Sequence, residues 1–216
     1  MDSNYIGTAE KFVKDRLAGE GTGHDWWHVV RISNTARKIH EKEGGDWQII
    51  YLALLLHDVG DWKVVKQEKD DYTIAENFMI ETGIDKKVID EVMFIIKNMS
   101  FSKSLDVADV SKSIEFQIVQ DADRLDAIGA IGVGRAFAFG GSRARMMYNP
   151  DYTTQQFASS ADYRSAESST IHHFHEKLFF LKDKLNTATA KQIAEDRDKF
   201  MRQFVDEFMA EWDGER

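Results

Sequence analysis

The chain reads Ala53-Leu54-Leu55-Leu56-His57-Asp58-Val59-Gly60-Asp61, so an apolar run ends directly in a histidine–aspartate pair. His28 lies earlier in the chain and Asp123 later, both in apolar segments with helical spacing. Burying imidazole and carboxylate groups is unfavourable unless they are paired or bind a metal. A divalent cation is the simplest reason for bringing the two histidines and two aspartates together. The pattern therefore predicts a metal-dependent helical enzyme.

Spacings of three and four between apolar residues recur along the whole chain, and period-two alternation is hard to find. The single proline, Pro150, leaves long stretches uninterrupted. These patterns predict an all-α fold. We expect helices at about 3–18, 25–43, 47–58, 73–82, 85–98, 114–139, 160–186 and 189–212. The last two helices should pack back onto the others through an apolar stripe made of Phe174, Leu178, Leu181 and Leu185.

Composition narrows the class of protein. The 216 residues fit one domain and are enough to bury a core. A net charge of −9 argues against a general nucleic-acid or membrane-surface binder, which would present a basic face. There are no cysteines, so any metal must use His, Asp, Glu or water. The start of the chain lacks an apolar signal core, and the apolar run at 49–56 is too short to span a bilayer, so we expect a cytoplasmic protein.

Each of the candidate ligands also has a simpler interpretation when taken alone. A histidine after a leucine run, such as His57, is commonly a hydrogen-bonded core residue. Asp123 is equally typical of a carboxylate that favours the start of a helix. Adjacent residues such as His57 and Asp58 do not share a helix face, so they can turn toward one point only where the helix ends. Gly60 is consistent with such an end.

Three stretches, at residues 23–31, 53–61 and 118–129, resemble the HD-domain superfamily of metal-dependent phosphohydrolases. The sequence looks most like a bacterial branch of predicted phosphohydrolases whose substrates are poorly defined. The resemblance runs nearly end to end. It implies a single all-α domain over residues 1–216, with a helical core at about 24–139 and a C-terminal helical extension at about 140–216.

The resemblance also implies that His28, His57, Asp58 and Asp123 bind the metal. Some proteins of the superfamily carry further histidines between the doublet and the last aspartate and bind two ions, but here no histidine occurs between His57 and His172. We therefore expect one divalent ion per chain, with a bridged pair as the alternative. Mn²⁺, Co²⁺, Ni²⁺, Fe²⁺, Zn²⁺ and Mg²⁺ all accept such ligands. The ion would polarise a phosphoryl oxygen and lower the pKa of its water.

Two further aspartates are candidates for supporting this chemistry. Asp61 matches the acidic position of the HD-x-x-E/D pattern found in HD enzymes that hydrolyse guanosine polyphosphates, so we expect it to orient or deprotonate the water. A solvated loop carboxylate is the alternative. Asp126, one turn after Asp123, is expected to hold a metal ligand or Arg124 in place.

Basic residues are candidates for binding the phosphate of a substrate. Arg31 shares a helix face with His28, and Lys63 follows the histidine–aspartate pair closely. Arg143 and Arg145 lie in an irregular segment, from which they would clamp a phosphate through bidentate contacts. All four are also typical of ordinary surface charges.

Histidines and tryptophans outside this pattern are expected to be structural. His172, His173 and His175 cluster near the C-terminal end, and we expect a polar helix face with one buried member. Trp26 and Trp27 could stack on a nucleotide base, but tryptophan is mostly buried, so we expect both to anchor the core.

The leading prediction is hydrolysis of a phosphate ester in a nucleotide or another small phosphorylated metabolite. One alternative is an HD-type di-iron oxygenase, which needs more ligands than the pattern supplies. A second is a nucleotide-sensing module that binds without turnover, and a third is a helical structural protein with buried His/Asp pairs. The sequence leaves the substrate, the physiological metal and the oligomeric state open.

Overall fold

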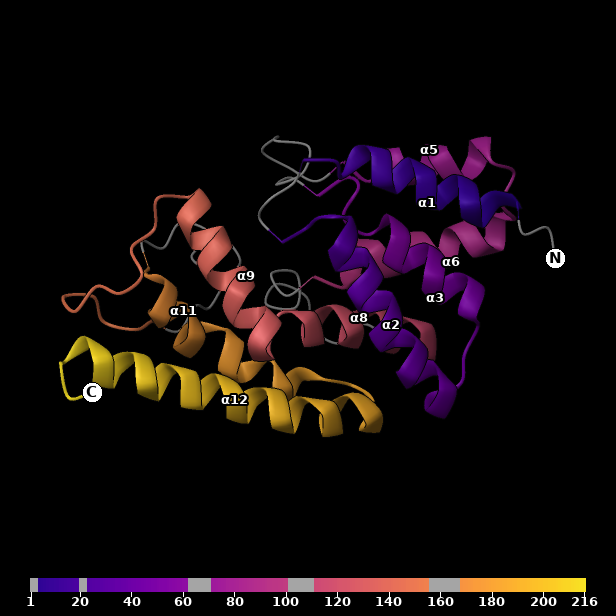
Figure 1. Ribbon diagram of the computed structural model, residues 1–216. Helices are drawn as coiled ribbons and strands as arrows, with labels where there is room; N and C mark the ends of the chain where they lie inside the picture. The colour runs from indigo at the N-terminus through magenta and orange to yellow at the C-terminus, as the bar shows by residue number, and fades with distance from the viewer. Residues whose placement is uncertain (1–3, 20–22, 62–70, 101–110, 156–167) are drawn as a thin grey trace.

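The computed structural model describes residues 4–19, 23–61, 71–100, 111–155 and 168–216 (Figure 1). Every secondary-structure element in these ranges is a helix, which confirms the predicted all-α fold. The elements are α1 (Asn4–Arg16), α2 (Trp26–Glu43), α3 (Trp47–Leu56), α5 (Thr73–Glu81), α6 (Lys86–Asn98), α8 (Ile114–Asp126), α9 (Gly129–Ser142), α11 (Thr170–Glu176), the 3-10 turns η1 (Leu178–Phe180) and η2 (Lys182–Lys184), and α12 (Ala188–Trp212). Among the described helices, none has both the length and the apolar character needed to cross a bilayer.

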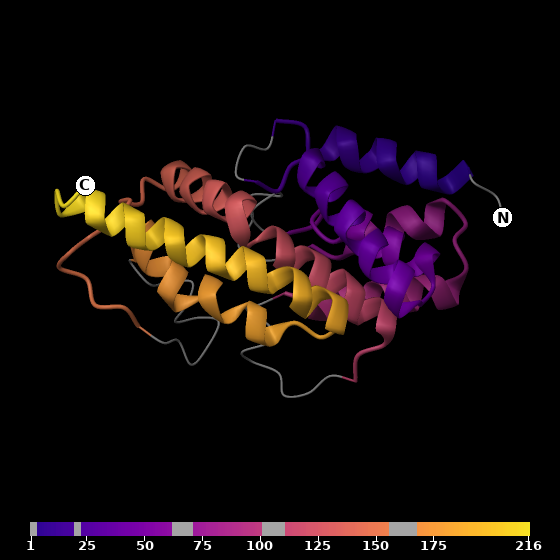
Figure 2. The ribbon, with the colours of Figure 1, turned by 60° about the horizontal axis from the view of Figure 1, so that its bottom comes forward.

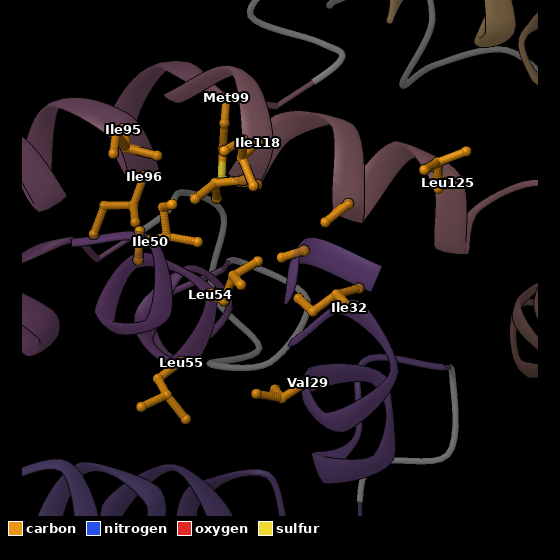
Figure 3. Close-up of a cluster of buried hydrophobic side chains, with 14 of the residues drawn as sticks. Val29, Ile32, Ile50, Leu54, Leu55, Ile95, Ile96, Met99, Ile118 and Leu125 are labelled. Carbon is orange, nitrogen blue, oxygen red and sulfur yellow. The ribbon is translucent and has the colours of Figure 1, made fainter. Parts of the chain in front are cut away.

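Helix α3 is the centre of the N-terminal half. Its residues from Leu52 to Leu56 are buried on every side, as expected for a helix that is apolar all round. Helices α1, α2, α6 and α8 surround it. Figure 3 shows side chains from α2, α3, α6 and α8 meeting in this core, among them Val29, Leu54, Ile95 and Ile118. The apolar run thus leads directly from the core to His57.

Helix α2 begins at a fixed point because Asp25 caps it. The side chain of Asp25 accepts a hydrogen bond from the backbone N–H of His28 at 2.8 Å. Such a cap satisfies a backbone donor that the first helical turn leaves without a partner. It also places His28 in the first turn of α2, facing the end of α3.

The prediction of one helix at 114–139 is wrong, because the structure has two helices there. Ile128 is extended, with φ −125° and ψ 167°, and Gly129 has φ +75°. A Cβ atom at Gly129 would also lie 2.9 Å from Cγ of Arg197 in α12. Glycine accepts both the left-handed backbone and the close approach. The break separates α8 from α9 and turns α9 toward the C-terminal helices (Figure 1).

The prediction of one helix at 160–186 is also wrong, because the structure has several short elements between residues 168 and 186. The first part of the predicted helix, 160–167, lies outside the described residues. Helix α11 ends after seven residues, and two 3-10 turns follow. Lys177, with φ −140° and ψ −55°, interrupts the regular backbone. The predicted apolar stripe is nevertheless buried in the core at all four positions: Phe174, Leu178, Leu181 and Leu185.

A buried carboxylate joins α8 to the segment that enters α12. Asp121 is fully buried. Its Oδ1 accepts hydrogen bonds from the backbone and side-chain amides of Asn186, at 2.9 and 2.8 Å. Its Oδ2 accepts from the backbone N–H and the hydroxyl of Thr187, both at 2.8 Å. Figures 1 and 2 show the result, with α8 between the N-terminal helices and the group formed by α9, α11 and α12.

We expect Asp121→Ala to lower the free energy of unfolding by about 3 kcal/mol, because it removes the acceptor of the buried donors of Thr187 and of the backbone N–H of Asn186. Urea-induced unfolding followed by circular dichroism measures this difference. Asp183→Ala removes an exposed carboxylate of η2 and serves as the control, with a change below about 0.5 kcal/mol. Equal stability of the two variants would contradict the role given to Asp121.

Candidate metal centre

His28 is oriented by a carboxylate behind its ring. The ring is fully buried, and its Nδ1 lies 2.7 Å from Oδ2 of Asp126. An ionised carboxylate can only accept, so the Nδ1–H donates to Asp126. The opposite nitrogen, Nε2, is then left with a lone pair. It faces His57 Nε2 at 3.3 Å, Asp123 Oδ1 at 3.5 Å and Asp58 Oδ2 at 3.7 Å.

The end of α3 turns His57 and Asp58 toward the same point. Helix α3 ends at Leu56, and His57 follows as its C-cap. The Nδ1–H of His57 donates to the carbonyl of Leu54 at 2.9 Å, which directs Nε2 toward the centre. That atom lies 3.2 Å from Oδ2 of Asp58. The helix end therefore resolves the problem that adjacent residues on a helix do not share a face.

The atoms around Nε2 of His28 are spaced much as neighbouring ligands of a cation are. Neighbouring ligands around an ion with bonds of about 2.0–2.2 Å lie roughly 3.0–3.4 Å apart. The distances between Nε2 of His28, Nε2 of His57 and Oδ2 of Asp58 are 3.2–3.7 Å, and Asp123 Oδ1 lies 3.5 Å from His28. The structure thus brings together all four side chains that the sequence selected as metal ligands.

The charges of the centre are strongly coupled. Burial alone would lower the pKa of His57, but the carboxylates of Asp58 and Asp123 raise it to about 9. Burial alone would raise the pKa of Asp123, but its contact with His28 and the charge of His57 hold it well below the usual range. The pKa of Asp58 is also lowered, because the charges of His57 and His24 outweigh its burial. Both carboxylates are therefore ionised at neutral pH and attract positive charge.

Among the four expected ligands, Asp123 is the most exposed to solvent. The side chains of His28, His57 and Asp58 are 0%, 6% and 6% exposed, whereas that of Asp123 is 31% exposed. Water or a substrate would therefore approach from the side of Asp123.

His24 belongs to the centre, although the sequence pattern did not identify it. Its Nδ1–H donates to Oδ2 of Asp58 at 2.9 Å. The side chains that could bind a metal thus form two overlapping groups. One group consists of His28, His57 and Asp123, and the other consists of His24, His28 and Asp58. His24 lies four residues before His28, a spacing that could have signalled it. It precedes the cap of α2, however, so helical periodicity does not apply to it.

Asp126 connects His28 to two arginines. Its Oδ1 accepts from Nε of Arg31 at 2.8 Å, and its Oδ2 accepts from Nη2 of Arg31 at 3.0 Å and from Nη1 of Arg135 at 2.8 Å. Burial would raise the pKa of Asp126, but hydrogen bonds from His28 and Arg31 and the charge of Arg135 hold it well below the usual range. An ionised Asp126 fixes the tautomer and orientation of the His28 ring. Arg124, its other expected partner, instead donates to the carbonyl of Lys184.

The remaining candidates have different positions. Arg31 is engaged by Asp126, so any contact with a substrate stays a prediction. Asp61 lies just after the turn that follows His57, and its backbone N–H donates to the carbonyl of Asp58 at 3.1 Å. Lys63 lies outside the described residues. Arg145 lies beyond the end of α9, where its charge acts on Tyr152.

The tryptophans and the C-terminal histidines can also be placed. Trp27 is 64% exposed, so the expectation that it anchors the core is wrong, because its side chain leaves the buried face of α2. Trp26 is half-buried and packs against the core. His172 is buried beside the hydroxyl of Ser169, at 2.6 Å, while His175 is exposed. This pattern matches the expected polar face with one buried member.

Comparison with known proteins identifies the class. The sequence profile of the HD domain matches residues 26–128, which include all four expected ligands. The protein YpgQ of Bacillus subtilis is 39% identical over 194 residues, which cover 90% of this chain and 87% of YpgQ. The chain therefore belongs to the HD-domain family.

Solved structures give the same result. A Lactobacillus plantarum protein matches with a TM-score of 0.90 at 33% identity, covering 99% of both chains. An HD-superfamily hydrolase of Bacillus thuringiensis matches with a TM-score of 0.73 at 38% identity, covering 99% of both chains. YpgQ of B. subtilis in complex with ADP matches with a TM-score of 0.74 at 35% identity, covering 95% of this chain and 97% of YpgQ.

We expect Asp126→Asn to weaken Mn²⁺ binding by roughly 10–100-fold, because His28 loses the charged acceptor that orients its ring. Isothermal titration calorimetry measures the affinity. Asp90→Asn, at an exposed carboxylate on α6, is the matched control and should bind Mn²⁺ as the unchanged protein does. If Asp126→Asn bound Mn²⁺ with unchanged affinity, Asp126 would have no part in the centre.

Metal affinity should also rise with pH. The pKa of His57 is raised to about 9, so at pH 7 a cation has to displace a proton from the ring. We expect the apparent Mn²⁺ affinity to increase by up to about tenfold per pH unit between about pH 6.5 and 8.5. Calorimetry in buffers of different ionisation enthalpy counts the protons released. An affinity that does not change over this interval would show that no ligand gives up a proton.

Proposed function

We propose that this chain is a metal-dependent phosphohydrolase that acts on a nucleotide or another small phosphorylated metabolite. One observation carries the proposal. Nε2 of His28 faces Nε2 of His57, Oδ2 of Asp58 and Oδ1 of Asp123, which all lie within 3.7 Å of it. Four such atoms repel one another unless positive charge lies between them, and an N₂O₂ set suits several divalent ions.

The bound ion would supply Lewis-acid polarisation of a phosphoryl oxygen and a water of lowered pKa. The chain supplies the rest. His28 and His57 direct their Nε2 atoms at the ion because their Nδ1–H groups donate to Asp126 and to the carbonyl of Leu54. The exposed side at Asp123 admits the substrate. Asp61, at the turn after Asp58, is proposed to orient the attacking water or accept its proton.

A nucleotide is the preferred substrate class because YpgQ has been crystallised in complex with ADP. At 39% identity, YpgQ is similar to this chain over most of its length. Bound ADP is equally compatible with a module that senses nucleotides without turnover. Product formation separates these two functions.

The di-iron alternative depends on the second group of possible metal ligands. His24, His28 and Asp58 could hold a second ion beside the first. Metal analysis of the protein as purified, together with measurement of oxygen uptake, separates the two cases. Two irons per chain with oxygen consumption would favour the oxygenase, whereas metal-dependent phosphate release without oxygen uptake would favour the hydrolase.

We expect the unchanged protein to release phosphate or pyrophosphate from a nucleotide panel when Mn²⁺, Co²⁺, Ni²⁺, Zn²⁺ or Mg²⁺ is added, and EDTA to stop the reaction. Asp58→Ala should lose both bound metal and turnover. Asp61→Asn should keep the metal and lower kcat by about 10²–10⁴-fold, the usual contribution of a general base. Full metal-dependent turnover by Asp58→Ala would show the proposal to be wrong.

A further inference from the structure

The carboxylate behind His28 is held by donors from two other helices. Oδ2 of Asp126 lies 2.7 Å from Nδ1 of His28 and 2.8 Å from Nη1 of Arg135. Arg31 pairs with the same carboxylate, with its Nε 2.8 Å from Oδ1 and its Nη2 3.0 Å from Oδ2. His28 and Arg31 both belong to α2, whereas Arg135 belongs to α9. Arg135 is therefore the donor that fixes the carboxylate independently of α2.

The side chain of Arg135 fits between Asp126 and the loop before α2. Only 16% of it is exposed. A Cβ atom at Gly23 would lie 2.9 Å from Nε and 3.0 Å from Cγ of Arg135, closer than side chains normally approach. Gly23 also has φ +93°, which glycine adopts more readily than other residues. The glycine thus leaves the space that the arginine occupies.

Arg135 lies outside the region that the HD-domain profile matches, which is 26–128. The break at Gly129 separates α8 from α9, and Arg135 reaches back across it to Asp126 at the end of α8. The hydrogen bonds then run from α9 through Asp126 to His28, whose Nε2 faces the other expected ligands. A residue beyond the matched region is thereby connected to a ligand within it.

We propose that Arg135 is a positioning residue of the metal centre, because it fixes the Asp126 carboxylate that orients His28. The proposal rests on the proposed function only in that a divalent ion binds at this centre. A carboxylate held by α2 alone could turn together with the side chains of that helix, whereas a donor on α9 limits this movement. A ligand that is already ordered loses less conformational entropy when the ion binds. Arg135 should therefore raise the affinity of the centre for a cation, although it is itself positively charged.

The positive charge of Arg135 separates this prediction from two other roles. One cation repels another, so removing a guanidinium that acted only through its charge would tighten metal binding. Removing a guanidinium that served only the fold would lower the free energy of unfolding and leave the metal affinity of the folded protein unchanged. Of the three roles, positioning is the one that predicts weaker metal binding by a folded variant.

The test measures Mn²⁺ affinity by isothermal titration calorimetry on the full chain. For Arg135→Met we expect binding to weaken by roughly 3–10-fold, less than for Asp126→Asn, because the arginine acts one step further from the ligand. Arg135→Lys should recover most of the affinity, since it keeps a charged donor on a long side chain. Arg202→Met is the matched control, because Arg202 pairs with the buried Asp198 of α12 at 2.9 Å. It should bind Mn²⁺ as the unchanged protein does.

A double-mutant cycle tests whether Arg135 acts through Asp126. Residues that act independently have additive effects, whereas residues in one hydrogen-bond network do not. In the Asp126→Asn background we expect Arg135→Met to change Mn²⁺ affinity by less than about twofold, because the carboxylate that Arg135 fixes is already absent. A further loss as large as that caused by Arg135→Met alone would contradict the proposal.

Gly23→Ala perturbs the same arginine from the other side. Its Cβ atom would displace the side chain of Arg135, so we expect Mn²⁺ binding to weaken in the same direction. Gly83→Ala is the control, because Gly83 has φ +72° and a Cβ atom there would meet no atom of the described residues within 4 Å. Gly83→Ala should leave Mn²⁺ affinity unchanged. Gly23→Ala and Arg135→Lys serve as the informative variants should Arg135→Met not fold.

The outcomes also separate this proposal from the hydrolase proposal. If the protein releases no phosphate from any nucleotide but Arg135→Met weakens Mn²⁺ binding as expected, then the positioning role stands and the hydrolase proposal fails. If the protein hydrolyses nucleotides but Arg135→Met binds Mn²⁺ with unchanged or higher affinity, then the positioning role is refuted. Absence of Mn²⁺ binding by the unchanged protein would refute it together with the metal centre. Circular dichroism and thermal unfolding check that each variant is folded.

Discussion

The rest of the structure depends on one constraint. Nitrogen and oxygen atoms of two histidines and two aspartates, which attract positive charge, are directed at one another beside an apolar core. The Nε2 atoms of His28 and His57 lie 3.3 Å apart, next to two carboxylates that remain ionised at neutral pH. Neither histidine can relieve this by turning its ring, because Asp126 and the carbonyl of Leu54 hold the opposite nitrogens. The fold therefore keeps open a place for positive charge, which a proton on His57 or a metal ion can occupy.

Three carboxylates on a single helix have three different tasks. Asp121 of α8 is fully buried and holds the segment that enters α12. Asp123, two positions later, faces the centre, and Asp126 supports His28 from behind. Because successive positions on a helix point about 100° apart, one short helical stretch serves the C-terminal packing, the metal centre and the orientation of a ligand. Stability and function are thus linked through α8.

The two halves of the chain contribute differently. The part matched by the HD-domain profile contains the expected ligands and the apolar helix α3 that carries His57 to the centre. The part that follows contributes Arg135, whose Nη1 donates to Oδ2 of Asp126 at 2.8 Å. Asp121 joins the two parts, because it accepts hydrogen bonds from Asn186 and Thr187.

The sequence by itself determined the all-α class and selected the four side chains that the structure brings together, because the apolar spacing and the position of His57 and Asp58 after a leucine run are local properties. It did not reveal the break at Gly129 or the irregular backbone around Lys177, since apolar periodicity continues through both. The roles of His24 and Arg135 were decided only by the tertiary structure. His24 meets Asp58 34 positions away, Arg135 meets Asp126 across the break at Gly129, and His28 and Asp126 lie 98 positions apart. Periodicity predicts which face of a helix is buried, whereas only packing decides which charged groups meet there.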